Sequence, residues 1–156
     1  MKRGLYWILA FLAACCATPW AFWHQGRIQK HGRKLTEQEL TYAMDLGVTQ
    51  PEEIYVSVVD RVPNPLHFLF SLLNRCGASC VIDAAGITLG RGIYLSADCA
   101  GSAALMAHEL VHIQQYQRVG SIWAFMIEYI HQCLMHGYYD ADWEVEARQE
   151  SARVLA

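Results

Sequence analysis

The sequence predicts an α+β fold, in which a small β-sheet packs on a helix that carries an H-E-x-x-H pattern and on two further helices. Three observations support this prediction. Residues 5–23 are continuously apolar, residues 54–62 and 79–96 are rich in β-forming residues, and residues from about 100 to 155 carry three helical patterns in succession. The first of these segments adds a hydrophobic helix at the N-terminal side of the fold.

The apolar segment LYWILAFLAACCATPWAFW, residues 5–23, has no charged residue and follows Lys2 and Arg3. As a transmembrane helix it has the required length, because about 20 residues cross the hydrocarbon core. As an export signal it contains LAAC at 12–15, which resembles a bacterial lipobox and would place cleavage and lipidation at Cys15. The apolar residues after Cys15 favour an uncleaved anchor, so we predict a membrane anchor or signal segment over residues 1–23.

The next stretch, HQGRIQKHGRK at 24–34, is polar and basic, and we interpret it as a juxtamembrane linker. Lys2 and Arg3 favour a cytoplasmic N-terminus. The positive-inside rule would keep a second group of cations in the cytoplasm as well, namely Arg27, Lys30, Arg33 and Lys34. The two groups of charges conflict over which side of the membrane the domain at 35–156 faces.

The domain is predicted to begin with a short helix, which Thr36 and Glu39 start with a capping box and Gly47 ends. IYVSVVDRV (54–62) predicts a strand, and PLHFLFSLLNRCG (65–77) a second short helix. The segment 79–96 predicts two strands, at about 80–84 and 86–95, with bends at Ala85–Gly86 and Gly90.

Three helices are predicted to follow. The first covers about 100–118 and stops at Gly120, and the second is capped by Ser121 and stops at Gly137. Asp142 would cap a third helix over 143–155. The middle helix is only about 15 residues long and contains Glu128 and His131, so we expect a buried core helix and not a second membrane span.

Charge and cysteine content narrow the function classes. A net charge of −3 and a pI near 6.1 give no general attraction to nucleic acid, so no nucleic-acid partner is expected. Outside the apolar segment, four cysteines could pair as disulfides or remain free thiols: Cys76, Cys80, Cys99 and Cys133.

The pattern H-E-x-x-H is formed by His108, Glu109 and His112 in MAHELVHIQQY. On a helix, residues four apart lie about 5–6 Å from each other between Cβ atoms, so both imidazoles can bind one zinc ion. Glu109 borders the open position of that ion, where it can take a proton from the attacking water and pass it to a leaving amine.

A catalytic zinc needs a third protein ligand. The extended pattern with Gly and a third His fails, because Gln115 and Arg118 occupy those positions. DWEVEARQES offers three carboxylates on the last helix, Glu144, Glu146 and Glu150. If zinc binds His108 and His112, Glu144 is the favoured third ligand, with Glu146 as the alternative and His131 and His136 as weaker candidates.

AHELVHIQQYQRVGS followed by HGYYDADWEVEAR resembles the gluzincin-type metallopeptidases of bacteria, a group similar to the metallopeptidase-like domain of contractile injection system proteins. The resemblance covers about residues 36–150. It implies a zincin-like fold, Zn²⁺ as the cofactor, His108, His112 and Glu144 as its ligands, and Glu109 as the catalytic base. It also implies that ITLGRGIYLS contains an edge strand on which a substrate backbone could bind. Arg148 stands where related zinc peptidases often carry Asp.

We therefore expect a membrane-attached zinc metallopeptidase that acts on a peptide or protein. The expected location is the inner membrane of a bacterium, with the periplasmic side slightly favoured. Candidates for stabilising the oxyanion are Arg91, His136, Tyr138 and Tyr139. The alternative from another class is a non-catalytic, zinc-stabilised interaction domain. No oligomeric state follows from the sequence.

Overall fold

The computed structural model describes residues 2–64 and 84–156, and within them the fold is α+β. The elements in chain order are α1 (Lys2–His31), β1 (Arg33–Lys34), α2 (Glu37–Asp45), the 3-10 turn η1 (Pro51–Glu53), β2 (Tyr55–Val59), β3 (Gly86–Leu89), β4 (Gly92–Ser96), α4 (Ala103–Val119), α5 (Ile122–His136) and α6 (Asp142–Val154). The helix predicted at 65–77, almost all of the strand predicted at 80–84, and Cys76 and Cys80 lie outside the described residues.

The strands form a small mixed sheet in the order β1-β2-β4-β3. β2 pairs parallel with β4, while β1–β2 and β3–β4 are antiparallel. The strand predicted over 86–95 is divided at Gly90, where a bend was predicted and where φ is +62°, a value that a residue with a side chain rarely adopts. The result is a tight hairpin that makes β3 one of the two edge strands of the described sheet.

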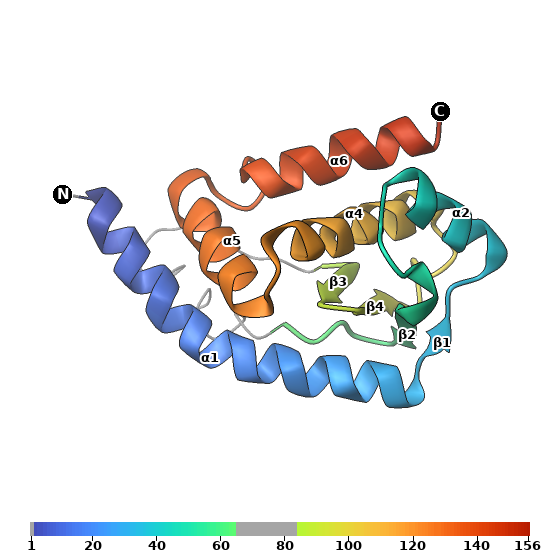
Figure 1. The fold of residues 1–156 in the computed structure, drawn as a ribbon. Coiled ribbons are helices and arrows are strands. Elements are labelled where there is room, and N and C mark those ends of the chain that lie inside the picture. The colour runs from blue at the N-terminus through green and yellow to red at the C-terminus, as the bar shows by residue number, and fades with distance from the viewer. Residues whose placement is uncertain (1, 65–83) are drawn as a thin grey trace.

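The sheet is buried on both faces. Val56, Ile93 and Leu95 pack with apolar side chains of α2 and α4, whereas Tyr94 belongs to a second core formed with α1 and α5. Side chains along a strand alternate between faces, so this division places α4 on one face and α1 on the other. Figure 1 shows the same arrangement, with the strands between the two helices.

α1 is one helix of 30 residues that includes most of the predicted linker. Its last turns pack on the sheet: His24 Nδ1 lies 3.2 Å from the hydroxyl of Tyr94, and the side-chain carbonyl of Gln25 accepts a hydrogen bond from the Arg91 amide at 3.0 Å. Gly92 permits this approach, because a Cβ there would lie 2.8 Å from a methyl carbon of Ile28. Residues 24–31 of the predicted juxtamembrane linker are therefore helical and packed on the sheet.

The other predicted helices are confirmed, with small changes at their ends. Thr36 and Glu39 form the capping box of α2, and Ser102 and Ser121 cap α4 and α5. The last helix begins one residue earlier than predicted, with Ala141 as the N-cap and Asp142 in its first turn. α5 packs between α1 and the helices of the domain, and Phe125 and Ile130 are buried in its core, as expected for a core helix.

Candidate metal centre

α4 carries the H-E-x-x-H residues on the face that meets the rest of the domain. The helix is anchored against the sheet by Leu110 and Ile113, both fully buried, and this packing fixes its rotation. The same rotation places His108, Glu109 and His112 beside β3 and α6. Glu109 and His112 are buried, and the side chain of His108 remains 17% exposed.

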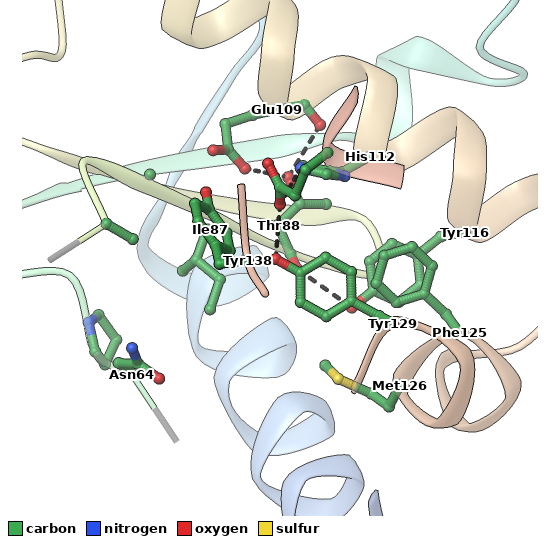
Figure 2. A pocket seen from close by; sticks show the side chains of 14 residues that line it. Asn64, Ile87, Thr88, Glu109, His112, Tyr116, Phe125, Met126, Tyr129 and Tyr138 are labelled. Carbon is green, nitrogen blue, oxygen red and sulfur yellow. Dashed lines mark hydrogen bonds and ion pairs between the residues drawn. The ribbon is translucent and has the colours of Figure 1, made fainter. Parts of the chain in front are cut away.

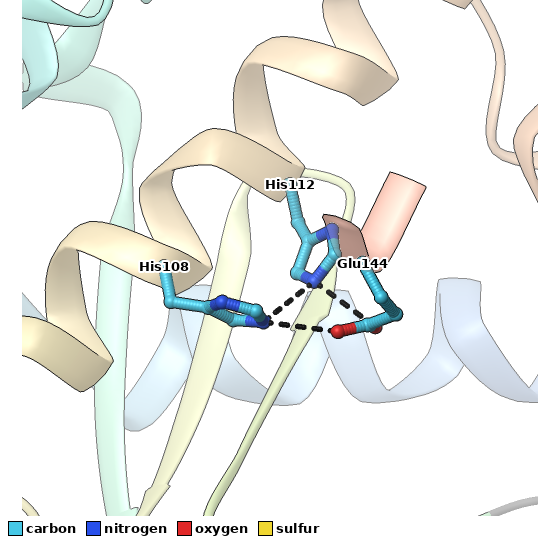
Figure 3. Close-up of side chains that lie close together, drawn as sticks. All are labelled: His108, His112 and Glu144. Carbon is cyan, nitrogen blue, oxygen red and sulfur yellow. Dashed lines mark hydrogen bonds and ion pairs between the residues drawn. The ribbon is translucent and has the colours of Figure 1, made fainter. Parts of the chain in front are cut away.

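Side chains of three residues converge beside β3 and α6 (Figure 3). His108 Nε2 and His112 Nε2 lie 3.1 Å apart. Glu144, from the first turn of α6, places Oε2 at 3.2 Å from His108 Nε2 and Oε1 at 3.4 Å from His112 Nε2. These groups could hold a metal ion.

The distances between the ligand atoms fit a small tetrahedral metal ion. Ligands bound at about 2.0–2.1 Å in a tetrahedron lie about 3.3 Å from each other, close to the observed separations. Two imidazole nitrogens and one carboxylate oxygen are also a common donor set of catalytic zinc sites. The residues present therefore fit zinc in both geometry and chemistry.

Glu144 is held in place by a hydrogen bond from α5. The Tyr129 hydroxyl donates to Glu144 Oε1 at 2.6 Å, while Oε2 accepts no hydrogen bond from any described residue. Burial alone would raise the pKa of Glu144, but His108 and His112 outweigh it and hold that pKa well below its usual range. The carboxylate thus stays charged in a buried position, with Oε2 facing His108 and Oε1 facing His112.

The electrostatics of the site favour a positive charge. Burial would lower the pKa of His112, yet the neighbouring carboxylates Glu144 and Glu109 raise it to about 9. A group of negative charges that stabilises a cationic imidazole would also stabilise a bound metal cation.

Glu109 is positioned by β3 (Figure 2). The Thr88 hydroxyl lies 2.7 Å from Glu109 Oε2 and 3.0 Å from the Glu109 backbone carbonyl, so it can donate to either oxygen. Gly86 leaves room for the carboxylate, because a Cβ at that position would lie 2.5 Å from Glu109 Oε1. Burial raises the pKa of Glu109, and His112, His108 and Thr88 offset this only in part. Glu109 therefore has a higher proton affinity than an exposed glutamate.

A buried glutamine orients His112. Gln115 is fully buried, and its amide nitrogen donates to the Trp143 carbonyl and to Glu146 Oε2, both at 2.9 Å. Its amide oxygen must then accept from His112 Nδ1, which lies 2.7 Å away. With the proton on Nδ1, the lone pair of Nε2 is directed at the metal position.

The same network separates the two candidate third ligands. Both oxygens of Glu146 bind the guanidinium of Arg118 at 2.7 Å, and one also accepts from Gln115. Glu146 therefore points away from His108 and supports His112 through Gln115, whereas Glu144 faces the metal position. Gln115, Thr88 and Tyr129 were not identified from the sequence. Only Gln115 carried a signal, since it lies three residues after His112 on the same helix face.

The other residues suggested by the sequence are placed differently. Tyr138 lines the cavity beside Glu109 and Glu144 (Figure 2), and burial together with these carboxylates raises its pKa. Tyr139 is 68% exposed, and Arg91 binds Glu53 and Gln50 at the opposite end of the hairpin. His131 stacks on Trp7, and His136 is exposed at the end of α5. Of the four candidates for the oxyanion donor, Tyr138 lines this cavity, and Tyr139 lines the neighbouring cavity together with Tyr138, His108 and Glu109.

Comparison with family models gives one match. Residues 77–120 match the eCIS core domain. The matched stretch contains the β3–β4 hairpin and all of α4, including His108, Glu109 and His112. It confirms the predicted link to contractile injection system proteins, while the assignment to a metallopeptidase family stays a prediction. No curated protein and no solved structure matches the chain.

The positions of the two glutamates predict unequal effects on metal binding. Glu144→Ala removes a ligand, so it should weaken zinc binding by more than the 10–100-fold typical of losses around a ligand. Glu146→Ala removes only support for Gln115 and should weaken it by no more than that range. Competition with a chromogenic zinc chelator measures both constants. A larger effect of Glu146→Ala would assign the third ligand to Glu146.

Gln115 provides a second prediction. Gln115→Met keeps the approximate volume but removes the acceptor for His112 Nδ1, so zinc affinity should fall by about 10–100-fold. Gln117→Met is the matched control, because Gln117 lies on the same helix and its side chain bonds to Thr49 alone among the described residues. An equal loss of affinity in both variants would show that the effect is not specific to the histidine.

Proposed function

We propose that this protein is a membrane-attached, zinc-dependent peptidase with a zincin-like fold. The observation that carries the proposal is the convergence of His108, His112 and Glu144 on one point, with the buried Glu109 beside them on the same helix as the histidines. Ligands and a proton acceptor in this arrangement suit hydrolysis of a peptide bond.

The residues would divide the chemistry among them. A zinc ion bound by the three ligands would polarise the scissile carbonyl and activate a water molecule. Glu109 would take the proton of that water and deliver it to the leaving amine, and its raised pKa favours holding the proton between the two steps. Tyr138 stays protonated because its pKa is raised, so its hydroxyl could donate to the developing oxyanion.

The position of β3 supports a peptide as the substrate. β3 is one of the two edge strands of the described sheet, its Thr88 hydroxyl lies 2.7 Å from Glu109 Oε2, and its Gly86 leaves room for the same carboxylate. An extended peptide that pairs with β3 would therefore lie beside the catalytic glutamate, held by backbone hydrogen bonds.

One observation favours the alternative of a non-catalytic, zinc-stabilised interaction domain. Glu144 is 1% exposed and Glu109 3% exposed, and a closed, buried site is typical of structural zinc. A second cavity reaches the site from the surface, however, and its lining includes His108, Glu109 and Tyr138. This opening would give a substrate access, which supports the enzyme over the structural role.

Attachment to a membrane rests on α1. Its residues Gly4–His31 are long and apolar enough to cross a bilayer, a property shared with signal sequences and some buried helices. We propose the inner membrane of a bacterium as its location.

The test is digestion of a broad peptide library by the full-length protein in mild detergent. Wild type should cleave it, a zinc chelator should abolish cleavage, and added zinc should restore it. Absence of cleavage from a protein that carries one zinc per chain would support the interaction domain instead. Cleavage that the chelator leaves unchanged would reveal a contaminating peptidase.

A further inference from the structure

α1 has its small side chains on the inside and its large apolar side chains on the outside. Four alanines spaced three or four residues apart are 0–2% exposed and belong to the core shared with α5: Ala10, Ala14, Ala17 and Ala21. The opposite side carries exposed apolar residues, which we call the outer face: Leu5, Ile8, Leu12, Phe22 and Trp23. Ile8 and Trp23 are each 60% exposed.

This distribution is the reverse of what water favours. A helix in contact with water buries its large apolar residues, because each contributes about 1.5–3 kcal/mol when removed from the solvent. In lipid that driving force is absent, and helices associate through small residues that allow close packing while large ones face the acyl chains. The outer face of α1 therefore fits a lipid environment.

Positive charges at the C-terminal end of the outer face also fit a lipid bilayer. Arg27 and Lys30 are exposed and follow Trp23 by four and seven residues. The guanidinium of Arg27 lies 5.6 Å from the centre of the Trp23 ring. Tryptophan and cations together are typical of the boundary between acyl chains and headgroups, and cations attract anionic lipids.

The contacts of α1 decide its orientation. Its first half packs on α5, and its second half packs on β2, β3 and β4, so the domain lies along one side of the helix for its whole length (Figure 1). If the apolar half of α1 crossed the bilayer in this arrangement, α5 would enter the hydrocarbon with it, because α5 packs on this half and His131 stacks on Trp7. Ionisable side chains such as Glu128 and His131 of α5 are costly there.

We propose that α1 lies in the plane of an anionic bilayer, with its outer face in the acyl region and Arg27 and Lys30 among the headgroups. This inference rests on the membrane attachment in the proposed function and replaces a crossing helix with one that lies along the surface. It also makes α1 a permanent part of the core. Cleavage before Cys15 would remove Ala10 and Ala14 from the contact with α5.

The first experiment determines topology. Epitope tags are fused before Met1 and after Ala156 of the full chain, and membrane vesicles of known orientation are treated with protease. If α1 lies in the plane of the membrane, the protease should digest both tags or neither. Before protease treatment, the mass of the chain should show that no N-terminal segment has been cleaved off. Tags on opposite sides would overturn the in-plane arrangement while leaving the membrane attachment intact. A chain that begins at Cys15 would overturn the permanent role of α1.

The second experiment tests the outer face. The double variant Ile8→Asp, Leu12→Asp should bind vesicles of phosphatidylcholine and phosphatidylglycerol at least tenfold more weakly than wild type, because membrane affinity scales with the buried apolar area. Met44→Asp is the matched control, since Met44 is also 60% exposed but lies on α2. The double variant should keep its zinc content, which shows that the fold survives.

Two further outcomes of the vesicle assay have a clear meaning. Replacing both Arg27 and Lys30 with Gln should weaken binding to the anionic vesicles by about fivefold per cation and leave binding to pure phosphatidylcholine nearly unchanged. Wild-type binding by the double aspartate variant would overturn the assignment of the outer face. If wild type does not bind vesicles and instead forms a dimer in buffer, a second copy covers the outer face. That outcome would also contradict the proposed membrane attachment.

Discussion

Glu109→Gln should lower peptide cleavage by about 10²–10⁴-fold and leave zinc content and melting temperature near those of wild type. Gln has the same shape as Glu and can keep the hydrogen bond with the Thr88 hydroxyl, but it cannot take a proton. Glu109 is not one of the three residues that could hold the metal ion. The substitution should therefore lower the catalytic rate without affecting metal binding or folding. The rate is measured as kcat/KM on a peptide that wild type cleaves.

A surface substitution provides the control for this variant. Glu150→Gln makes the same chemical change at an exposed position, where Glu150 pairs only with Arg153 among the described residues, and should leave activity unchanged. If Glu109→Gln retains full, chelator-sensitive activity, Glu109 is not the base. If it loses zinc or unfolds, its role is structural, and the interaction-domain alternative gains support.

His108→Ala and His112→Ala should each abolish the one zinc per chain expected of wild type. Each removes one of three ligands, so the loss of affinity should exceed the 10–100-fold typical of residues that merely support a ligand. Elemental analysis of the full-length protein, purified in detergent without chelator, measures the stoichiometry. Cleavage of the library should disappear in both variants, because the metal and the activity depend on the same atoms.

His136→Ala is the control for the histidine variants, because His136 is exposed and lies at the end of α5, away from the ligand atoms. It should keep one zinc per chain. Wild-type protein without metal would contradict the proposed centre, as would retention of zinc in both ligand variants.

The sequence by itself determined the helices around the site and three of its residues. Helix caps are local, since a Ser or Thr side chain bonds a backbone amide only three residues away, and the starts of α2 and α5 were therefore predicted from Thr36 and Ser121. The start of α4 was predicted at about residue 100, three residues before the helix that Ser102 caps. His108 and His112 are four residues apart, so one helical turn brings them together whatever the rest of the chain does. The predicted helix start at Asp142 was one residue late because no side chain caps α6.

The tertiary structure decided what depends on contacts between distant segments. The sequence favoured Glu144 but left Glu146 as an alternative; the packing of α6 against α4 turns Glu144 towards the histidines and Glu146 towards Arg118. Thr88 approaches Glu109 because β3 lies beside α4, although 21 residues separate them in the chain. No local pattern encodes such a pairing, since it depends on how the elements pack.

The N-terminal segment shows the same division. Its composition determined that it is helical and apolar, because 19 uncharged residues in a row leave few other possibilities. Composition did not reveal that the helix continues to His31, or which of its faces is covered. That was decided by α5 and the sheet, which bury Ala14 and Ile28 on one side and leave Ile8 and Trp23 exposed on the other. Only the neighbours of a helix determine which of its faces meets protein and which meets solvent or lipid.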